Sequence, residues 1–338
     1  MKIVEHRQRL ELALDLFNGC AHSCAGCMVE KESGSSLDDL VEIHSLTREL
    51  VSYGFTAFDV TLGPTDSMSA DNLQEVMRNK NLIQIVELFR AFTLNTSFLE
   101  KKKELYLRLC EDVDTLIGEK PIRFLIPAAP NAFKNEKFVN GIKARVDYVL
   151  EGLKKAKLIE VGFVVNCTVD TLVDGFESLL QTAFASEFSV PKDDILNIPY
   201  GRLRYKDIRV AGEVLNISRK ISTFYSQLDG ESERTCNPDL DYPTGTQLNL
   251  LYNGGKLYWV PFLKDECAYL DPLFEIPKPW TADNVLDRRA EQMLLSLDYV
   301  KGTQCETCQY LPSCSEKGIT TLMEALSIKD CLVGVEYV

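Results

Sequence analysis

Three cysteines near the start of the chain have the spacing of a metal-binding loop. They are Cys20, Cys24 and Cys27, which form a C-x3-C-x2-C pattern in the segment FNGCAHSCAGCMVEK. Three thiolates can hold three irons of a four-iron cluster and leave the fourth iron open to a ligand. The alternative is a structural zinc site, but zinc takes four ligands in a closed tetrahedron, and His22 would be a strained fourth. The spacing therefore favours an iron–sulfur cluster.

A second group of cysteines lies towards the other end of the chain and is large enough to close a complete metal site. Its members are Cys305, Cys308, Cys314 and Cys331. Four thiolates suit either a four-iron cluster or a zinc ion, and their spacing does not separate the two. The sequence leaves open whether Cys236 and Cys267 take part in any metal site.

The composition of the chain limits the classes of protein that it can be. Its 338 residues are 45% apolar and 26% charged, which is ordinary for a globular protein with a large and a smaller domain. Because no apolar run could span a membrane and the first residues lack a signal-peptide pattern, we expect a cytoplasmic protein with reduced cysteines. A net charge of −13 argues against a broad nucleic-acid surface.

Strand-like and helix-like segments alternate over the first two-thirds of the chain. Strands are expected at 12–18, 55–62, 92–98, 122–127, 158–167 and 194–200, and helices at 36–54, 70–90, 142–153 and 171–186. The first helix should begin with a capping box formed by Ser36 and Asp39. Six successive β-then-α units predict an α/β fold with a parallel sheet, as a partial (β/α)6 barrel, although a flat doubly wound sheet fits the periodicity almost as well.

The pattern changes after about residue 230. Residues 247–262 predict a β-hairpin with its turn at Asn253-Gly254-Gly255, and a helix is expected near 284–297. We therefore expect a barrel domain at 1–230 and a small C-terminal domain at 231–338.

The first cysteine group and its position after a strand resemble the radical S-adenosylmethionine (SAM) superfamily. The resemblance implies a partial barrel and a 4Fe-4S cluster whose open iron binds SAM. The segment TLGPTD (61–66) stands where the family has a Gly-Gly-Glu-like motif, and only Gly63 matches it. The residues that this resemblance and the strand ends assign to SAM are Gly26, Gly63, Pro64, Thr65, Asn95 and Asn166. The alternative for each is an ordinary turn or loop-capping residue.

The second cysteine group resembles the SPASM extension of radical SAM enzymes. In that pattern the first three cysteines and a distant one bind one auxiliary 4Fe-4S cluster, which assigns Cys305, Cys308, Cys314 and Cys331. Gly318 replaces a cysteine of the family's other auxiliary cluster, and Trp259 and Val260 stand where the hairpin carries one. The resemblance therefore implies a twitch-like extension with a single auxiliary cluster.

The resemblance also implies a reaction. SAM would be cleaved to a 5′-deoxyadenosyl radical that abstracts hydrogen from a substrate C–H bond. The substrate expected is a ribosomally made peptide that becomes crosslinked, epimerised or oxidised. The alternatives are dehydrogenation or epimerisation of a small molecule such as an aminosugar, and a zinc-stabilised binding protein without activity.

Further partners and site residues follow from the same interpretation. We expect an electron donor such as flavodoxin or ferredoxin. Because the cluster loop starts at residue 20, a leader-binding module would have to come from a separate protein. Cys167 is a candidate hydrogen-atom donor or a buried structural thiol, and Cys110 is expected in the core. Tyr200 and Arg202 could bind a substrate carboxylate, or Arg202 could form a surface ion pair.

Overall fold

The computed structural model describes most of the chain. The described residues are 9–20, 35–63, 65–128, 132, 134–156, 159–167, 203–205, 247–260, 272–316, 318–325, 327 and 329. Among them, no helix combines the length and the apolar character that crossing a bilayer requires.

The described strands form one mixed sheet. They are β1 (Arg9–Leu14), β2 (Thr56–Leu62), β3 (Ala91–Asn95), β4 (Ile122–Ala128), β5 (Ile159–Cys167), β6 (Leu203–Tyr205), β7 (Gln247–Asn253), β8 (Lys256–Trp259) and β9 (Glu275–Ile276). Their order in the sheet is β6-β5-β4-β3-β2-β1-β7-β8-β9. Strands β1 to β7 pair with one another in parallel, whereas β8 pairs antiparallel with both β7 and β9.

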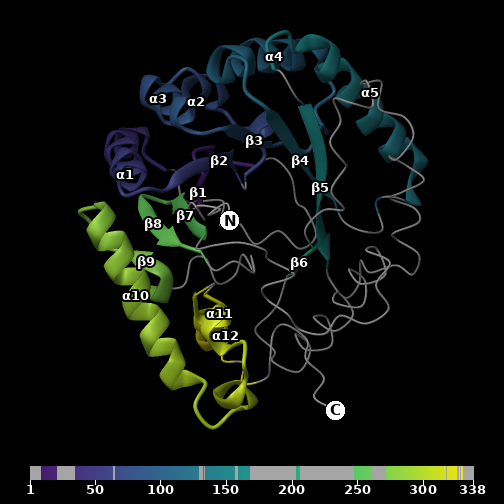
Figure 1. The fold of residues 1–338 in the computed structure, drawn as a ribbon. Helices are drawn as coiled ribbons and strands as arrows, with labels where there is room; N and C mark the ends of the chain where they lie inside the picture. Colours follow the sequence, from purple (N-terminus) through teal and green to yellow (C-terminus); the bar gives the residue numbers. More distant parts are fainter. Residues whose placement is uncertain are drawn as a thin grey trace, which may run out of the picture.

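The described helices fall into two groups, an N-terminal one that packs around the strands and a C-terminal one whose members contact one another. They are α1 (Leu40–Ser52), α2 (Leu73–Met77), α3 (Lys80–Leu88), α4 (Lys103–Ile117), α5 (Glu136–Gly152), α10 (Ala282–Tyr299), α11 (Leu311–Glu316) and α12 (Ile319–Ala325). Figure 1 shows α1 to α5 as an arc around the strands. The first six strands follow one another in chain order, whereas a doubly wound sheet reverses its order near the middle. The strand order therefore excludes the flat alternative and confirms a partial barrel.

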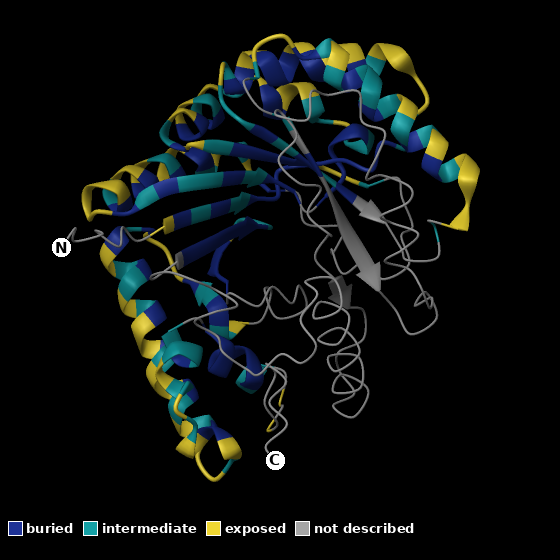
Figure 2. Cartoon of the chain, turned by 45° about the vertical axis from the view of Figure 1, so that its right-hand side comes forward, coloured by how far each residue is buried: buried dark blue, intermediate teal, exposed yellow. Residues whose placement is uncertain are grey.

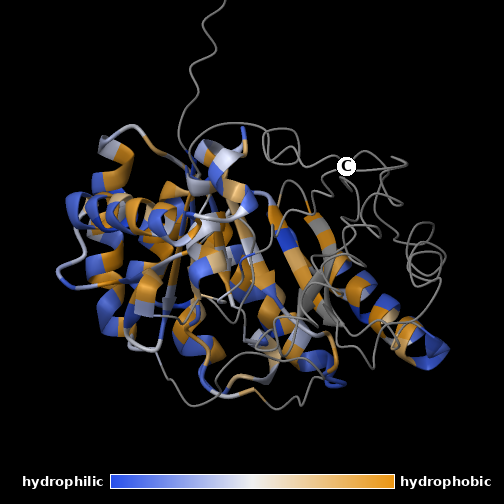
Figure 3. Cartoon of the chain, turned by 90° about the horizontal axis from the view of Figure 1, so that it is seen from below, coloured by the Kyte–Doolittle hydropathy of each residue, from blue (hydrophilic) through white to orange (hydrophobic). Residues whose placement is uncertain are grey.

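The two faces of the sheet differ in chemistry. Alternate residues of β1, namely Leu10, Leu12 and Leu14, are fully buried beneath the helices. The stripe expected on the first helix, Leu40, Ile43, Leu46 and Leu50, lies in the same core. Figure 2 shows the strands mostly buried and the outward helix surfaces exposed, and Figure 3 shows the helices striped with hydrophobic and hydrophilic residues. The hydrophobic effect thus holds the helices to one face and leaves the other face for polar groups.

The first strand differs from its predicted position. It spans Arg9–Leu14 instead of 12–18, although Leu16 and Phe17 are buried as expected. The Asn72 side chain takes the place of a neighbouring strand here, because its Nδ2 donates to Leu16 O at 2.9 Å and its Oδ1 accepts from Asn18 N at 2.8 Å. This loop therefore has the apolar sequence of a strand, but a side chain makes the hydrogen bonds that a neighbouring strand would make. The third strand likewise ends at Asn95 instead of 98.

The start of the first helix is also only partly as predicted. The Ser36 hydroxyl accepts from Asp38 N at 3.2 Å, so it caps the 3-10 turn Leu37–Asp39 that leads directly into α1. Among the described residues the Asp39 carboxylate does not complete the box, because Tyr252 and Lys278 bind its two oxygens. Tyr252 comes from β7 of the hairpin, and Lys278 follows β9.

The predicted hairpin and C-terminal helix are confirmed. Gly254 and Gly255 have φ of 56° and 77°, the positive values that a two-residue hairpin turn requires. Strand β7 pairs with β1, so the hairpin extends the barrel sheet itself. The boundary near residue 230 lies outside the described residues and stays a prediction. The predicted strand at 194–200 also lies outside them, and the strand beside β5 is Leu203–Tyr205.

Candidate active site at the ends of the first three strands

The described part of the first cysteine group is Cys20, which lies half-buried after β1. The Ser69 hydroxyl, in the turn Ser67–Ser69 after β2, donates to Cys20 Sγ at 3.8 Å. The same hydroxyl also lies 3.3 Å from Asp66 O, so its single hydrogen is shared between the two acceptors. Hydrogen bonds to the sulfurs tune the potential of an iron–sulfur cluster, so the described surroundings of Cys20 fit a ligand of such a cluster. Cys24, Gly26 and Cys27 lie outside the described residues.

The ends of β2 and β3 meet at Gly63 and Asn95. Gly63 N donates to Leu14 O at 3.0 Å, and Gly63 has φ of +139°, which residues with a Cβ rarely adopt. A Cβ at this position would lie 2.1 Å from Asn95 Nδ2. Only glycine therefore lets the buried Asn95 side chain lie against this turn. The structure brings these two predicted residues together, and their contact with SAM stays a prediction.

Asp66 connects the loops that follow β2 and β3, which form the rim of the site. The sequence did not predict this role. Asp66 Oδ1 accepts from Ser97 N at 2.6 Å, and Asp66 Oδ2 accepts from Ser69 N at 3.0 Å. The carboxylate is buried, and it joins the loops after β2 and β3. In the segment 61–66 the sequence marks Asp66 only as a departure from the family motif. An aspartate directly before the turn Ser67–Ser69 is a helix-capping signal that could have revealed half of this role.

Two further hydroxyls at this rim are fully buried, those of Ser67 and Thr96. Neither has a hydrogen-bond partner among the described residues. Because buried polar groups are generally satisfied, two such hydroxyls in neighbouring loops fit a rim that holds a polar ligand. Thr65, which was predicted to contact SAM, is buried in the same loop.

Other predicted site residues are described only in part or not at all. Asn166 and Cys167 end β5, as predicted, where their backbone pairs with Arg204 and Tyr205. Arg204 therefore belongs to β6. Pro64, Tyr200 and Arg202 lie outside the described residues.

The second cysteine group lies in short helical turns. Cys305 is buried in the turn Gln304–Thr307, Cys308 ends that turn, and Cys314 lies in α11. Among the described residues, no group of three His, Cys, Asp or Glu side chains could hold a metal ion. Cys331 lies outside them, as do Cys236 and Cys267. The auxiliary cluster thus stays a prediction, and no reaction step is assigned to it.

The buried cysteine expected in the core is confirmed. Cys110 lies in α4, is 3% exposed, and has its Sγ 3.6 Å from Val149 O. Burial, strengthened by the nearby Asp114 carboxylate, raises the pKa of this thiol to about 12. Cys110 is therefore a protonated, structural residue.

The strand order and the cysteine-bearing rim together define a class of fold. A parallel sheet that winds in one direction, with Cys20 after its first strand and a hairpin beside that strand, is the fold that the resemblance of the first cysteine group implies. The resemblance that the sequence suggested is thus confirmed at the level of the fold.

Two solved structures illustrate this similarity. SuiB of Streptococcus suis bound to S-adenosylmethionine is 12% identical, and the match covers 97% of this chain and 76% of SuiB with a TM-score of 0.50. The enzyme anSMEcpe with bound AdoMet and Cp18Cys peptide is 11% identical, and the match covers 91% of this chain and 88% of anSMEcpe with a TM-score of 0.50. At these identities the likeness shows the fold alone. No family model and no curated protein matches the sequence.

Proposed function

We propose that this chain is a radical SAM enzyme. In this proposal Cys20, Cys24 and Cys27 hold a 4Fe-4S cluster, and the enzyme abstracts hydrogen from a substrate C–H bond. The observation that carries the proposal is the place of Cys20: it follows the first strand of a partial barrel and accepts a hydrogen bond from Ser69. A structural zinc site would need neither the barrel nor the buried polar rim.

The chain's own residues would bind and orient SAM at this rim. When bound, the cluster supplies the electron that cleaves SAM into methionine and a 5′-deoxyadenosyl radical. The residues assigned to SAM are Gly26, Gly63, Pro64, Thr65, Asn95 and Asn166. Backbone carbonyls of the segment after β2 would accept the SAM ammonium group, and the Ser67 and Thr96 hydroxyls are further donors for its polar atoms. The buried residues of this rim would keep water away from the reacting atoms.

A peptide is the substrate class that we propose. One structure of similar fold, anSMEcpe, contains a peptide. The inner face of the sheet also suits a peptide, whose backbone needs hydrogen-bond donors and acceptors. The buried leucines of β1 point to one face of the sheet. The other face carries polar residues at paired positions of neighbouring strands: Glu11, Asp59, Thr93, Arg123 and Asn249. These residues would surround a polar chain with both charge signs.

We assign two further roles on the same basis. Cys305, Cys308, Cys314 and Cys331 would bind an auxiliary 4Fe-4S cluster that exchanges electrons with the active site. The electron for SAM cleavage would come from a flavodoxin- or ferredoxin-type donor. Cys167 remains a candidate hydrogen-atom donor, and Tyr200 and Arg202 remain candidate substrate contacts.

Anaerobic reconstitution tests the proposed function. The protein should be brown, hold about eight irons per chain, and produce 5′-deoxyadenosine from SAM in the presence of dithionite. Cys20→Ala should abolish this product, whereas Cys110→Ala, which removes a remote core thiol, should retain it. A colourless protein that contains zinc, or cleavage that survives Cys20→Ala, would overturn the proposal.

The substrate class needs a separate experiment. Candidate peptides that carry deuterium at single side-chain positions should transfer label to 5′-deoxyadenosine, which mass spectrometry detects. Transfer from a labelled aminosugar and from none of the peptides would instead show a small-molecule enzyme.

A further inference from the structure

The β7–β8 hairpin contacts the chain directly before the first cysteine group. Asp15 N donates to Tyr252 O at 2.9 Å, which continues the pairing of β1 and β7 past the end of β1. The Asn253 side chain then donates from Nδ2 to Asp15 Oδ2 at 2.8 Å. Both side chains of this second bond are buried, so water cannot easily replace either partner.

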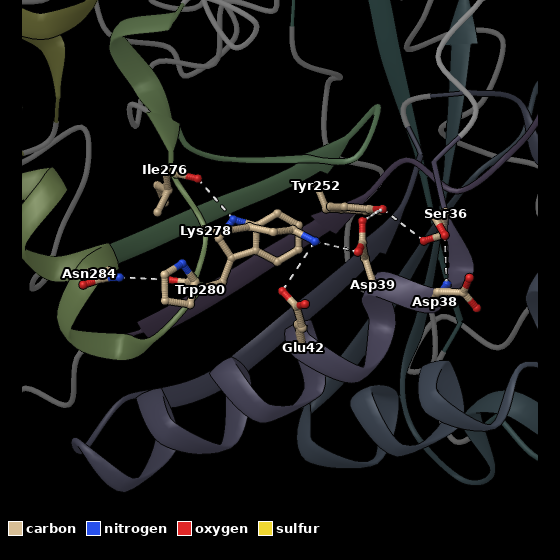
Figure 4. A network of polar contacts seen from close by, with 10 residues as sticks. Ser36, Asp38, Asp39, Glu42, Tyr252, Ile276, Lys278, Trp280 and Asn284 are labelled. Carbon is tan, nitrogen blue, oxygen red and sulfur yellow. Dashed lines mark hydrogen bonds and ion pairs between the residues drawn. The ribbon is translucent and has the colours of Figure 1, made fainter.

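The same hairpin also contacts the chain directly after the cysteine loop. Gly254 N donates to Ser35 Oγ at 3.0 Å. The Tyr252 hydroxyl lies 3.0 Å from Ser36 O and 2.7 Å from Asp39 Oδ2, so its single hydrogen is shared between two acceptors. Figure 4 shows the contacts of Tyr252 with Ser36 and Asp39. Three consecutive residues, 252–254, therefore bind both ends of the segment that carries Cys20, Cys24 and Cys27.

The C-terminal part of the chain holds Tyr252 in place. Its ring meets Trp280 edge to face, with centroids 5.7 Å apart, and the Trp280 indole donates to Ile276 O at 3.1 Å. Lys278 lies over the Trp280 ring and binds Asp39 Oδ1 at 2.8 Å. Each oxygen of the Asp39 carboxylate is thus bound, one by Tyr252 and the other by Lys278, as Figure 4 shows.

Tyr252 remains a hydrogen-bond donor over the whole working pH range. Its side chain is fully buried, and this burial raises the pKa of the phenol. The hydrogen bond to Asp39 and the negative charge of that carboxylate raise the pKa further. The phenol therefore keeps its hydrogen, and the contact with the start of α1 persists.

We infer that Tyr252 and Asn253 are positioning residues for the iron–sulfur loop, because they fix the distance between its two ends from outside the cysteine segment itself. This inference rests on the proposed function. Fixing both ends of a loop lowers the entropy that must be lost when the loop closes around its cluster. The hairpin would thereby couple the C-terminal part of the chain to the geometry at the SAM-binding iron.

Two matched tyrosine variants test this role. Tyr252→Phe keeps the ring against Trp280 and removes the hydroxyl. Tyr106→Phe is the control, because Tyr106 is equally buried and its hydroxyl also donates to a backbone carbonyl, that of Glu100 at 2.9 Å. Both variants should unfold at similarly reduced denaturant concentrations. Only Tyr252→Phe should weaken SAM binding, about tenfold for one lost bond to a charged group.

The electron paramagnetic resonance spectrum of the reduced enzyme supplies the readout, because SAM perturbs only the cluster with an open iron. Titration with SAM gives an affinity for each variant. Asn253→Ala, which acts at the other end of the loop, should shift the titration in the same direction. An unchanged affinity in Tyr252→Phe, or an equal loss in Tyr106→Phe, would overturn the positioning role.

Hydrogen–deuterium exchange separates this inference from the proposed function, because it needs no cluster. Peptides that contain the Asp15 and Gly254 amides should exchange faster in Tyr252→Phe and at the wild-type rate in Tyr106→Phe. If the wild type showed no SAM-dependent signal, the proposed function would fail, and the exchange result alone would decide whether the hairpin fixes the loop ends.

Discussion

The two cysteine regions of this protein are held by contacts of different range. Around Cys20 the contacts join distant parts of the sequence. The Ser69 hydroxyl donates to Cys20 Sγ, and Asn253 of the hairpin donates to the Asp15 carboxylate. Around the second group the contacts are local. Cys308 N donates to Cys305 O, and Cys314 N donates to Tyr310 O.

This difference indicates different roles for the two regions. The second region has a small core of its own, formed by Val300, Cys305, Ile319 and Met323. The helices around it mainly contact one another, although Leu322 of α12 belongs to the main core, and the proposed auxiliary cluster would stabilise this unit or carry electrons. The first region depends on several strands at once, which suits a site whose atoms must be placed accurately for catalysis. The predictions below test this contrast.

The largest expected effect separates the two groups directly. Cys20→Ala should eliminate formation of 5′-deoxyadenosine, because loss of a direct ligand costs more than the about 10–100-fold lost with outer-shell partners. Cys308→Ala should lower the iron content and stop substrate turnover, yet SAM cleavage without substrate should continue. Iron analysis and product chromatography measure both. Equal loss of SAM cleavage in the two variants would contradict the assigned difference.

The next effect concerns the long-range brace at the first region. Asp66→Ala removes a buried carboxylate that accepts two backbone hydrogen bonds, so the free energy of unfolding should fall by about 3 kcal/mol. Thr303→Ala is the local counterpart, since its hydroxyl accepts from Cys305 N at 3.2 Å and donates to Val300 O at 2.6 Å, both close in the sequence. This cap should contribute about 1 kcal/mol. Urea denaturation checks both values, and a larger loss in Thr303→Ala would reverse the comparison.

A third effect tests the close approach of β2 and β3. Gly63→Ala should reduce stability by about 1–3 kcal/mol, from the positive φ and from the clash with Asn95. Gly118→Ala is the control, because Gly118 also has a positive φ, +60°, but no atom within 4 Å of its added Cβ. Only Gly63→Ala should also weaken SAM binding. A normal SAM titration in Gly63→Ala would remove this turn from the site.

Features encoded locally could be predicted from the sequence. The hairpin turn follows from Asn253-Gly254-Gly255, and the helix stripe of α1 follows from its periodicity. Contacts between distant segments could not be predicted. The Asn72 side chain makes a hydrogen bond to Leu16 that a neighbouring strand would otherwise make. The Asp66 carboxylate accepts from Ser97 N, which follows a different strand. The pairing of β7 with β1 is of the same kind, because a periodicity of two residues carries no information about the neighbouring strand.

The smallest effect on the cysteine chemistry is expected at Cys110, which belongs to neither group. Its thiol should resist alkylation by iodoacetamide at pH 9 in the folded enzyme and react only after unfolding. The pH dependence of stability follows from the raised pKa: the unfolded thiol loses its proton near 9.0, whereas the folded thiol keeps it to about 12. Stability is therefore fully present below pH 9 and falls as the pH rises towards 12, by at most about 1.4 kcal/mol per pH unit.

Cys110→Ala should remove this slope and leave both iron content and SAM cleavage unchanged. Urea midpoints measured between pH 8 and pH 10 compare the two proteins, and mass spectrometry locates the alkylated thiols. Rapid alkylation of Cys110 in the folded wild type would show that the thiol is accessible, and the separation of a core cysteine from the two cysteine regions would then be wrong. An unchanged slope in Cys110→Ala would assign the alkaline loss of stability to other groups, because a single buried thiol accounts for no more than one proton.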